Sequence, residues 1–149
     1  MQNLNLPAFD YQLKSNENKT LIFDIIRKKY VVLTPEEWVR QHFVNFLISI
    51  KNYPVSLVAI EKQIRLNKVT KRFDILIFSN SGKPHILIEC KAPNVHINQN
   101  TFDQIARYNS EINAEFLIVT NGLDHFCCQM DTESKKYIFL NFIPDFQSK

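Results

Sequence analysis

Three ionisable side chains near the middle of the chain have the types and spacing of a metal site. Asp74 lies within a nearly continuous apolar run, and Glu89 and Lys91 lie at the end of the next run. Side chains alternate between the two faces of a strand, so Glu89 and Lys91 share a face. Facing carboxylates on otherwise apolar strands repel each other unless a cation offsets their charge. The pattern therefore indicates a site for a hard divalent cation.

The turn between the two runs decides whether the carboxylates meet. Residues 80–83, Asn-Ser-Gly-Lys, make a tight turn. If this turn is symmetric, its two end residues face each other. The same register then puts Asp74 directly opposite Glu89, with Cβ atoms ~5 Å apart. Arg72 would lie across from Lys91 in that register. The sequence thus predicts a hairpin that brings both acids to one face.

Magnesium suits this donor set, with manganese as a substitute. Mg²⁺ takes oxygen ligands from one or two carboxylates and keeps several waters. It can polarise a phosphodiester and lower the pKa of a bound water. A lysine beside it can stabilise charge on the phosphoryl group. The alternative for the same residues is a strand with a peripheral salt bridge.

The elements that must position these residues follow from apolar spacing and turn residues. The pattern predicts the order β-hairpin, α, β, β, β, α, β, β, β. The hairpin covers 20–26 and 29–33, the helices cover 34–52 and 100–113, and the strands cover 57–66, 72–79, 84–91, 115–120, 125–130 and 136–142. A helix between two buried strands implies a right-handed crossover onto one sheet. The expected fold class is α/β, a mixed β-sheet with a helix on each face.

The first helix brings two more acids toward the strands. Thr34 fits the N-cap, Pro35 fits the first helical position, and Glu37 can close a capping box. Glu36 aligns with the inward stripe of the same helix. We prefer Glu36 as an acid that approaches the metal, and the choice between the two glutamates stays open at this point.

Length and composition indicate one globular domain. The chain has 149 residues, of which 45% are hydrophobic and 22% charged, with a net charge of +3 that permits nucleic-acid binding without requiring it. The cysteines do not form a disulfide framework, and there is neither a signal-like start nor an apolar run of the ~20 residues that a membrane span needs. We expect a cytoplasmic protein, with residues 1–19 as a loosely held arm and residues 20–149 as a single domain.

Four segments occur in an order and spacing that are specific together. They are residues 34–41 (TPEEWVRQ), 72–74 (RFD), 89–93 (ECKAP) and 104–108 (QIARY). In these segments the chain resembles the PD-(D/E)XK nuclease superfamily, and more narrowly the N-terminal nuclease domain of type I restriction enzyme restriction (R) subunits. The resemblance covers about residues 20–142. One departure is Phe73, which stands where the superfamily has its eponymous proline.

The resemblance implies a restriction-endonuclease-like mixed β-sheet flanked by helices, and a Mg²⁺-dependent endonuclease that cuts DNA. It implies Asp74 and Glu89 as metal ligands and Lys91 as the catalytic lysine, and the Cys90 backbone carbonyl could add a further ligand. Gln104 and Tyr108, which share a helix face, would contact metal-bound waters or the phosphate backbone. The plainer alternative for these two is a core tyrosine with a half-buried glutamine.

Partners follow from the same resemblance. DNA and other restriction-system subunits are expected, and the oligomeric state is open, a homodimer included. Lys68, Lys71 and Arg72 could contact DNA phosphates, although a solvated strand edge would have the same composition. Two other functions compete with DNA cleavage. One is a catalytically silent nucleic-acid-binding or scaffold module of the same fold, and the other is cleavage of RNA by the same chemistry.

Overall fold

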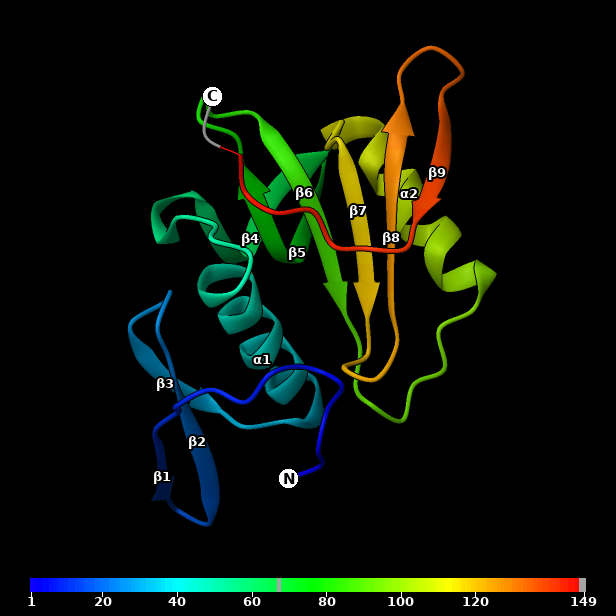
Figure 1. Cartoon of the computed structure of the whole chain (residues 1–149). Coiled ribbons are helices and arrows are strands. Elements are labelled where there is room, and N and C mark those ends of the chain that lie inside the picture. The colour runs from blue at the N-terminus through cyan, green and yellow to red at the C-terminus, as the bar shows by residue number, and fades with distance from the viewer. Residues whose placement is uncertain (67, 148–149) are drawn as a thin grey trace.

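Two β-sheets and two α-helices make up the fold (Figure 1), seen in a computed structural model that describes residues 1–66 and 68–147. The three-stranded sheet contains β1 (Leu13–Asn16), β2 (Lys19–Asp24) and β3 (Lys29–Val32). The six-stranded sheet runs β4 (Val58–Leu66), β5 (Val69–Phe78), β6 (Pro84–Cys90), β7 (Phe116–Thr120), β8 (His125–Asp131) and β9 (Lys136–Leu140). The helices are α1 (Pro35–Ser49) and α2 (Gln99–Ile112), with a 3-10 turn, η1 (Val55–Leu57), before β4.

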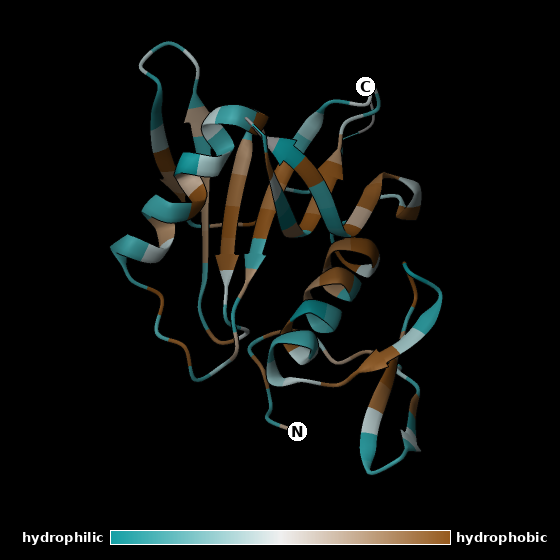
Figure 2. Ribbon diagram, turned by 180° about the vertical axis from the view of Figure 1, so that it is seen from behind, coloured by the Kyte–Doolittle hydropathy of each residue, from teal (hydrophilic) through white to brown (hydrophobic). Residues whose placement is uncertain are grey.

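The six-stranded sheet is mixed, as the sequence predicts. Strands β6 and β7 are parallel and joined by α2, whereas the other neighbouring strands are antiparallel. Figures 1 and 2 show α1 and α2 on opposite faces of this sheet, with the three-stranded sheet beside α1. The expected α/β fold class is therefore confirmed. Within residues 1–66 and 68–147, no helix has both the length and the apolar character that crossing a bilayer requires.

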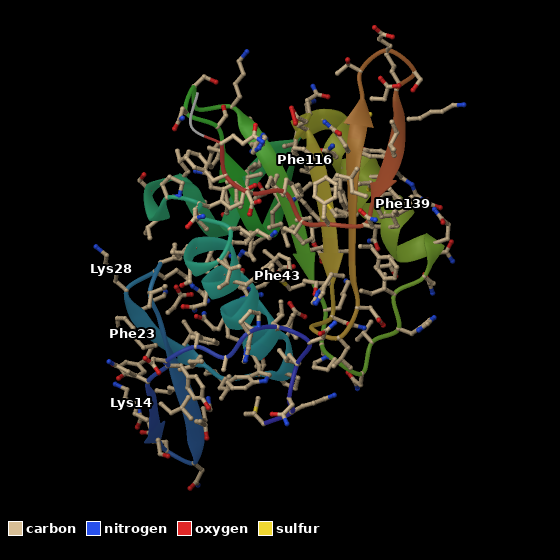
Figure 3. The ribbon with its side chains drawn as sticks, viewed as in Figure 1. Lys14, Phe23, Lys28, Phe43, Phe116 and Phe139 are labelled. Carbon is tan, nitrogen blue, oxygen red and sulfur yellow. The ribbon has the colours of Figure 1, made fainter. Side chains whose placement is uncertain are left out.

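Alternation along the strands divides the core into two layers. Ile75 and Ile88 belong to the layer under α1, whereas Leu76 and Leu87 belong to the layer under α2. Figure 3 shows Phe43 between α1 and the sheet, and this side chain is fully buried. Apolar burial on both faces explains why the central strands are continuous hydrophobic runs in the sequence, and Figure 2 shows these strands as the most hydrophobic part of the ribbon.

Side-chain caps fix where both helices begin. The Thr34 hydroxyl accepts a hydrogen bond from the Glu37 backbone N–H at 3.0 Å, as expected. The Asn98 side chain does the same for the Thr101 N–H at 3.0 Å before α2. α2 ends at Asn113, whose φ of +61° is a left-handed cap. These caps position the N-terminal turn of α1, which carries the acids discussed below.

The N-terminal residues correct the expectation of a loosely held arm. Strand β1 pairs with β2, so the expected hairpin is a three-stranded sheet. Before β1, the Asn5 N–H donates to the Gly122 carbonyl at 2.8 Å. The Trp38 indole N–H donates to the Gln2 carbonyl at 2.8 Å. Composition alone did not indicate the contacts of Gln2 and Asn5, because their partners lie far along the chain.

The pairing of β5 with β6 confirms the predicted central register but not the predicted turn. Ile75 lies opposite Ile88, as a symmetric turn would require. At the turn, however, the Ser79 N–H donates to the Lys83 carbonyl at 2.8 Å, so Asn80 does not face Lys83. An irregularity after Ile77 compensates for this one-residue asymmetry. The predicted pairing of the central residues is therefore correct, although the predicted turn is not.

Candidate active site

The candidate site lies where β5 and β6 diverge. Their pairing ends at Ile75 and Ile88. Past that point the Asp74 carboxylate enters the fork, and its Oδ2 accepts a hydrogen bond from the Cys90 backbone N–H at 2.9 Å. The next amide, that of Lys91, donates to Thr120 of β7 at 2.8 Å. The Asp74 carboxylate thus accepts the hydrogen bond of the Cys90 amide, which has no backbone partner on β5 because the two strands have separated.

This fork changes the expected relation between the two acids. The β5–β6 pairs stop before Asp74, so Asp74 and Glu89 do not form the predicted directly opposed pair. They nevertheless lie close enough to interact. Burial first, and then the charge of Asp74, raise the pKa of Glu89 to about 7, although Lys91 opposes the shift. The predicted pairing of Arg72 with Lys91 does not form either, because the β5–β6 pairs end at Ile75 and Ile88.

Arg40 of α1 is the centre of the acidic cluster. Its Nη2 lies 2.8 Å from Asp74 Oδ1, 2.9 Å from Glu61 Oε1 and 3.3 Å from Glu36 Oε1. Its Nη1 lies 2.7 Å from Glu37 Oε1. Burial opposes the charged form of Arg40, but the surrounding carboxylates, Glu37 foremost, raise its pKa above the ordinary value. The guanidinium therefore neutralises acids from α1, β4 and β5 at one point.

Glu37 connects this cluster to the three-stranded sheet. Its Oε1 also accepts from Arg27 Nη2 at 3.0 Å, and its Oε2 accepts from Gln41 Nε2 at 3.0 Å. Arg27 in turn pairs with Asp24 at 2.6 Å. Glu37 and Asp24 are both buried. The Glu37 carboxylate thus belongs to a buried ion-pair chain, a role that the predicted capping box did not give it.

Glu36 is the exposed member of the two helix-start acids and the one that faces the site. Burial, followed by the charge of Asp74, raises the pKa of Glu36, while Arg40 and Lys91 lower it. The side chain is 47% exposed. Its electrostatic neighbours are thus the predicted site residues, which supports the preference for Glu36, although a catalytic role stays a prediction.

The metal-free protein is expected to lose stability as the pH rises. Glu89 has a pKa of about 7 in the fold against 4.5 as its ordinary value, so its stabilising contribution is complete below pH 4.5 and lost as the pH passes 7. The loss is on the order of 3 kcal/mol. Urea unfolding of wild type and Glu89→Gln at several pH values measures it. Stability curves that stay parallel across this window would contradict the expectation.

A polar pocket of about 130 Å³ opens beside Lys91 on the α2 side. Lys91 Nζ lies 3.4 Å from Glu89 Oε1 at its wall. The full lining is Lys71, Arg72, Phe73, Glu89, Lys91, Thr101, Gln104, Ile105 and Tyr108. The Lys71 ammonium lies 4.3 Å from the centre of the Tyr108 ring. A hydrogen bond from Lys71 is the main cause that lowers the pKa of Tyr108. The pocket therefore offers donors and positive charge suited to an anion.

Most of the predicted site residues gather at the fork or this pocket. Gln104 and Tyr108 come to it from α2, and Lys71 and Arg72 come from β5. Lys68 lies in the exposed turn before β5 and does not appear among the described lining residues. Cys90 contacts Asp74 through its N–H, and a role for its carbonyl stays a prediction.

Sequence reasoning missed two residues of the cluster. Arg40 follows Glu36 and Glu37 by four and three positions, a spacing at which helical side chains pair, so a signal for it was present. Glu61 had no such signal, because its place depends on an unusual backbone with a φ of +56°. In the described part of the chain, no three His, Cys, Asp or Glu side chains form a ready set of metal ligands. The acids are instead arranged around the Arg40 guanidinium.

Comparison with known proteins gives the family. Residues 35–144 match the sequence model described as "Type I restriction enzyme R protein N terminus". A solved fragment, described as an HsdR subunit of a type I restriction enzyme from Vibrio vulnificus YJ016, has a similar fold with a TM-score of 0.55 and 17% identity, over 76% of this chain and 24% of that one. This chain thus spans about a quarter of the length of that fragment. A search of curated proteins finds no match. The matched region contains α1, the fork and the pocket, and the chain belongs to the family of type I restriction enzyme R protein N-terminal regions.

Proposed function

We propose that this chain is a Mg²⁺-dependent endonuclease domain of the PD-(D/E)XK type, which hydrolyses DNA phosphodiester bonds within a restriction system. The observation that carries the proposal is the meeting of Asp74, Glu89 and Lys91 around the β5–β6 fork. Family membership supports the restriction setting. DNA and other restriction-system subunits as partners belong to the same proposal.

The carboxylates at the fork fit a hard divalent cation. Asp74 and Glu89 supply oxygen donors, which Mg²⁺ prefers. Burial and Asp74 make ionisation of Glu89 unfavourable, a cost that a cation between two carboxylates removes. We propose Asp74 and Glu89 as ligands, the Cys90 carbonyl as a further one, and Mn²⁺ as a substitute ion. When bound, the cation would polarise the phosphodiester and lower the pKa of a bound water.

The remaining residues have roles that follow from the pocket. The Lys91 ammonium, 32% exposed beside Glu89, is placed to donate to a phosphoryl oxygen as charge develops there. Lys71 and Arg72 add positive charge that attracts the phosphate backbone. Gln104 and Tyr108 add hydrogen-bond donors from α2. A phosphodiester in this pocket would therefore contact Lys91 and the α2 residues together.

One observation favours a catalytically silent nucleic-acid-binding module. Both carboxylate oxygens of Asp74 are already engaged, Oδ1 by Arg40 and Oδ2 by the Cys90 N–H. A domain that kept these contacts permanently would hold nucleic acid without cutting it. Binding of Mg²⁺ measured by calorimetry separates the two functions, because only the nuclease needs the ion.

Incubation with supercoiled plasmid tests the proposal directly. Wild type is expected to nick the plasmid with Mg²⁺ or Mn²⁺ and not with EDTA. Lys91→Ala should be slower by about a hundredfold or more, because it removes a charge that stabilises the transition state. Lys83→Ala, an exposed lysine of the β5–β6 turn, is the matched control and should keep full activity.

Two results would redirect the proposal. Cleavage of structured RNA in place of plasmid would assign the same chemistry to a different substrate. Absence of any cleavage, together with no heat of Mg²⁺ binding at millimolar concentration, would leave the silent module as the function.

A further inference from the structure

The guanidinium of Arg40 has two sides with different surroundings. Nη1 lies 2.7 Å from Glu37 Oε1, and Glu37 is itself held by Arg27 at 3.0 Å. Nη2 faces the fork, where Asp74 Oδ1 lies at 2.8 Å and Glu61 Oε1 at 2.9 Å. One side is therefore anchored in a buried ion-pair chain, and the other side faces Asp74, one of the proposed metal ligands.

Nη2 occupies a position that carboxylates normally give to a cation. Three acids from α1, β4 and β5 lie within 3.3 Å of this single atom. Carboxylates gathered this closely repel one another unless a positive charge lies between them. Within the described residues, Arg40 supplies that charge while its own buried Nε has no hydrogen-bond acceptor. The position of Arg40 is therefore better explained by neutralisation of the surrounding carboxylates than by the hydrogen bonds that Arg40 makes.

The strained backbone at Glu61 indicates that its ion pairs with the arginines are a maintained feature of the cluster. Its φ of +56° lies in the left-handed region, which residues other than glycine seldom adopt. The β4–β5 pairing accordingly passes from Ile60 to Lys62 without it. Such strain persists only where surrounding contacts maintain it. Here the contacts are the ion pairs of its carboxylate with Arg40 at 2.9 Å and Arg72 at 3.4 Å.

We propose that Arg40 is a positioning residue that stands in for the divalent cation in the metal-free protein and releases Asp74 when the ion binds. The inference rests on the proposed function, because it concerns the same metal. After releasing Asp74, Arg40 retains Glu37 and Glu61, so the buried guanidinium is not left unpaired. Arg40 thereby keeps the acids assembled and lowers the affinity for the ion by competing with it.

Calorimetric titration with Mg²⁺ tests this competition. Arg40→Gln is expected to bind Mg²⁺ about tenfold more tightly than wild type, because the competing charge is gone. Without metal, Arg40→Gln should melt at a lower temperature than wild type. Mg²⁺ should then raise the melting temperature of Arg40→Gln by more than it raises that of wild type. Arg65→Gln is the matched control, since Arg65 is an exposed arginine farther along β4 and is given no role at the site. Its affinity should change by less than about twofold.

The outcomes separate this inference from the proposed function. Equal Mg²⁺ affinity of wild type and Arg40→Gln would overturn the competition and leave the metal site intact. Mg²⁺ binding by Arg40→Gln but not by wild type would support the competition, and would show that wild type by itself does not bind the ion that cleavage requires. No binding by any of the proteins would overturn both proposals. If Arg40→Gln does not fold, Arg40→Lys replaces it, because an ammonium cannot bridge Glu37 and Asp74 together. Affinity at or below that of wild type would then overturn the competition.

Discussion

Replacing Glu89 by glutamine is expected to slow metal-dependent nicking of plasmid DNA by at least about a thousandfold. The amide keeps the size of the side chain and removes the charge that a divalent cation needs. The same change removes a partly buried carboxylate whose ionisation Asp74 opposes. The variant should therefore be at least as stable as metal-free wild type at pH 8. Loss of activity without loss of stability is the signature of a ligand, and initial nicking rates together with urea unfolding measure both.

A second glutamate gives the control. Glu115 is exposed just before β7 and lies outside the fork, so Glu115→Gln should keep both the nicking rate and the stability of wild type. If Glu89→Gln nicked plasmid at the wild-type rate, Glu89 could not be a metal ligand. If it were less stable than wild type at pH 8, the carboxylate would have a structural role that its raised pKa does not indicate.

The fold could be predicted from the sequence where one pattern controlled the outcome. The apolar runs that become β5, β6 and β7 are buried on both faces, so their hydrophobicity left little choice of structure. The start of α1 depended on Thr34 and Pro35, which act locally. The register of β5 and β6 was right at Ile75 even though the expected turn was wrong, because the irregularity after Ile77 offsets the one-residue asymmetry of the turn.

The candidate site was less predictable, because its geometry depends on where pairing stops. Strand alternation brings residue types to a face, but it does not show that β5 and β6 separate before Asp74. Nor does it show that Asp74 would accept from the Cys90 N–H. Glu61 reaches the cluster through a left-handed backbone in a strand, which no propensity favours for glutamate. These features arise from contacts between distant elements, and a single sequence does not reveal them.

Removal of the two adjacent glutamates at the start of α1 is expected to lower stability to very different extents. Glu37→Ala should lower the free energy of unfolding by about 3–5 kcal/mol, because it leaves buried charges without their partner. Arg27, Arg40 and Gln41 all donate to this carboxylate. Glu36→Ala should cost less than about 1 kcal/mol, since its ion pair with Arg40 is solvent-exposed. Urea unfolding in EDTA measures both values without interference from bound metal.

Mg²⁺ binding should reverse this order, and the reversal is what distinguishes a site residue from a structural one. Glu36 interacts with Asp74 and Lys91, so Glu36→Ala should weaken Mg²⁺ binding while its stability stays near that of wild type. Glu36→Gln, which keeps the shape without the charge, should behave in the same way if charge is the cause. A loss of stability in Glu37→Ala as small as that expected for Glu36→Ala would show that the buried chain from Asp24 to Arg40 does not depend on Glu37. In that case the three-stranded sheet would be held to α1 by its apolar contacts and the hydrogen bond from Gln41 to Asp24, and the acids at the fork would be positioned independently of Glu37.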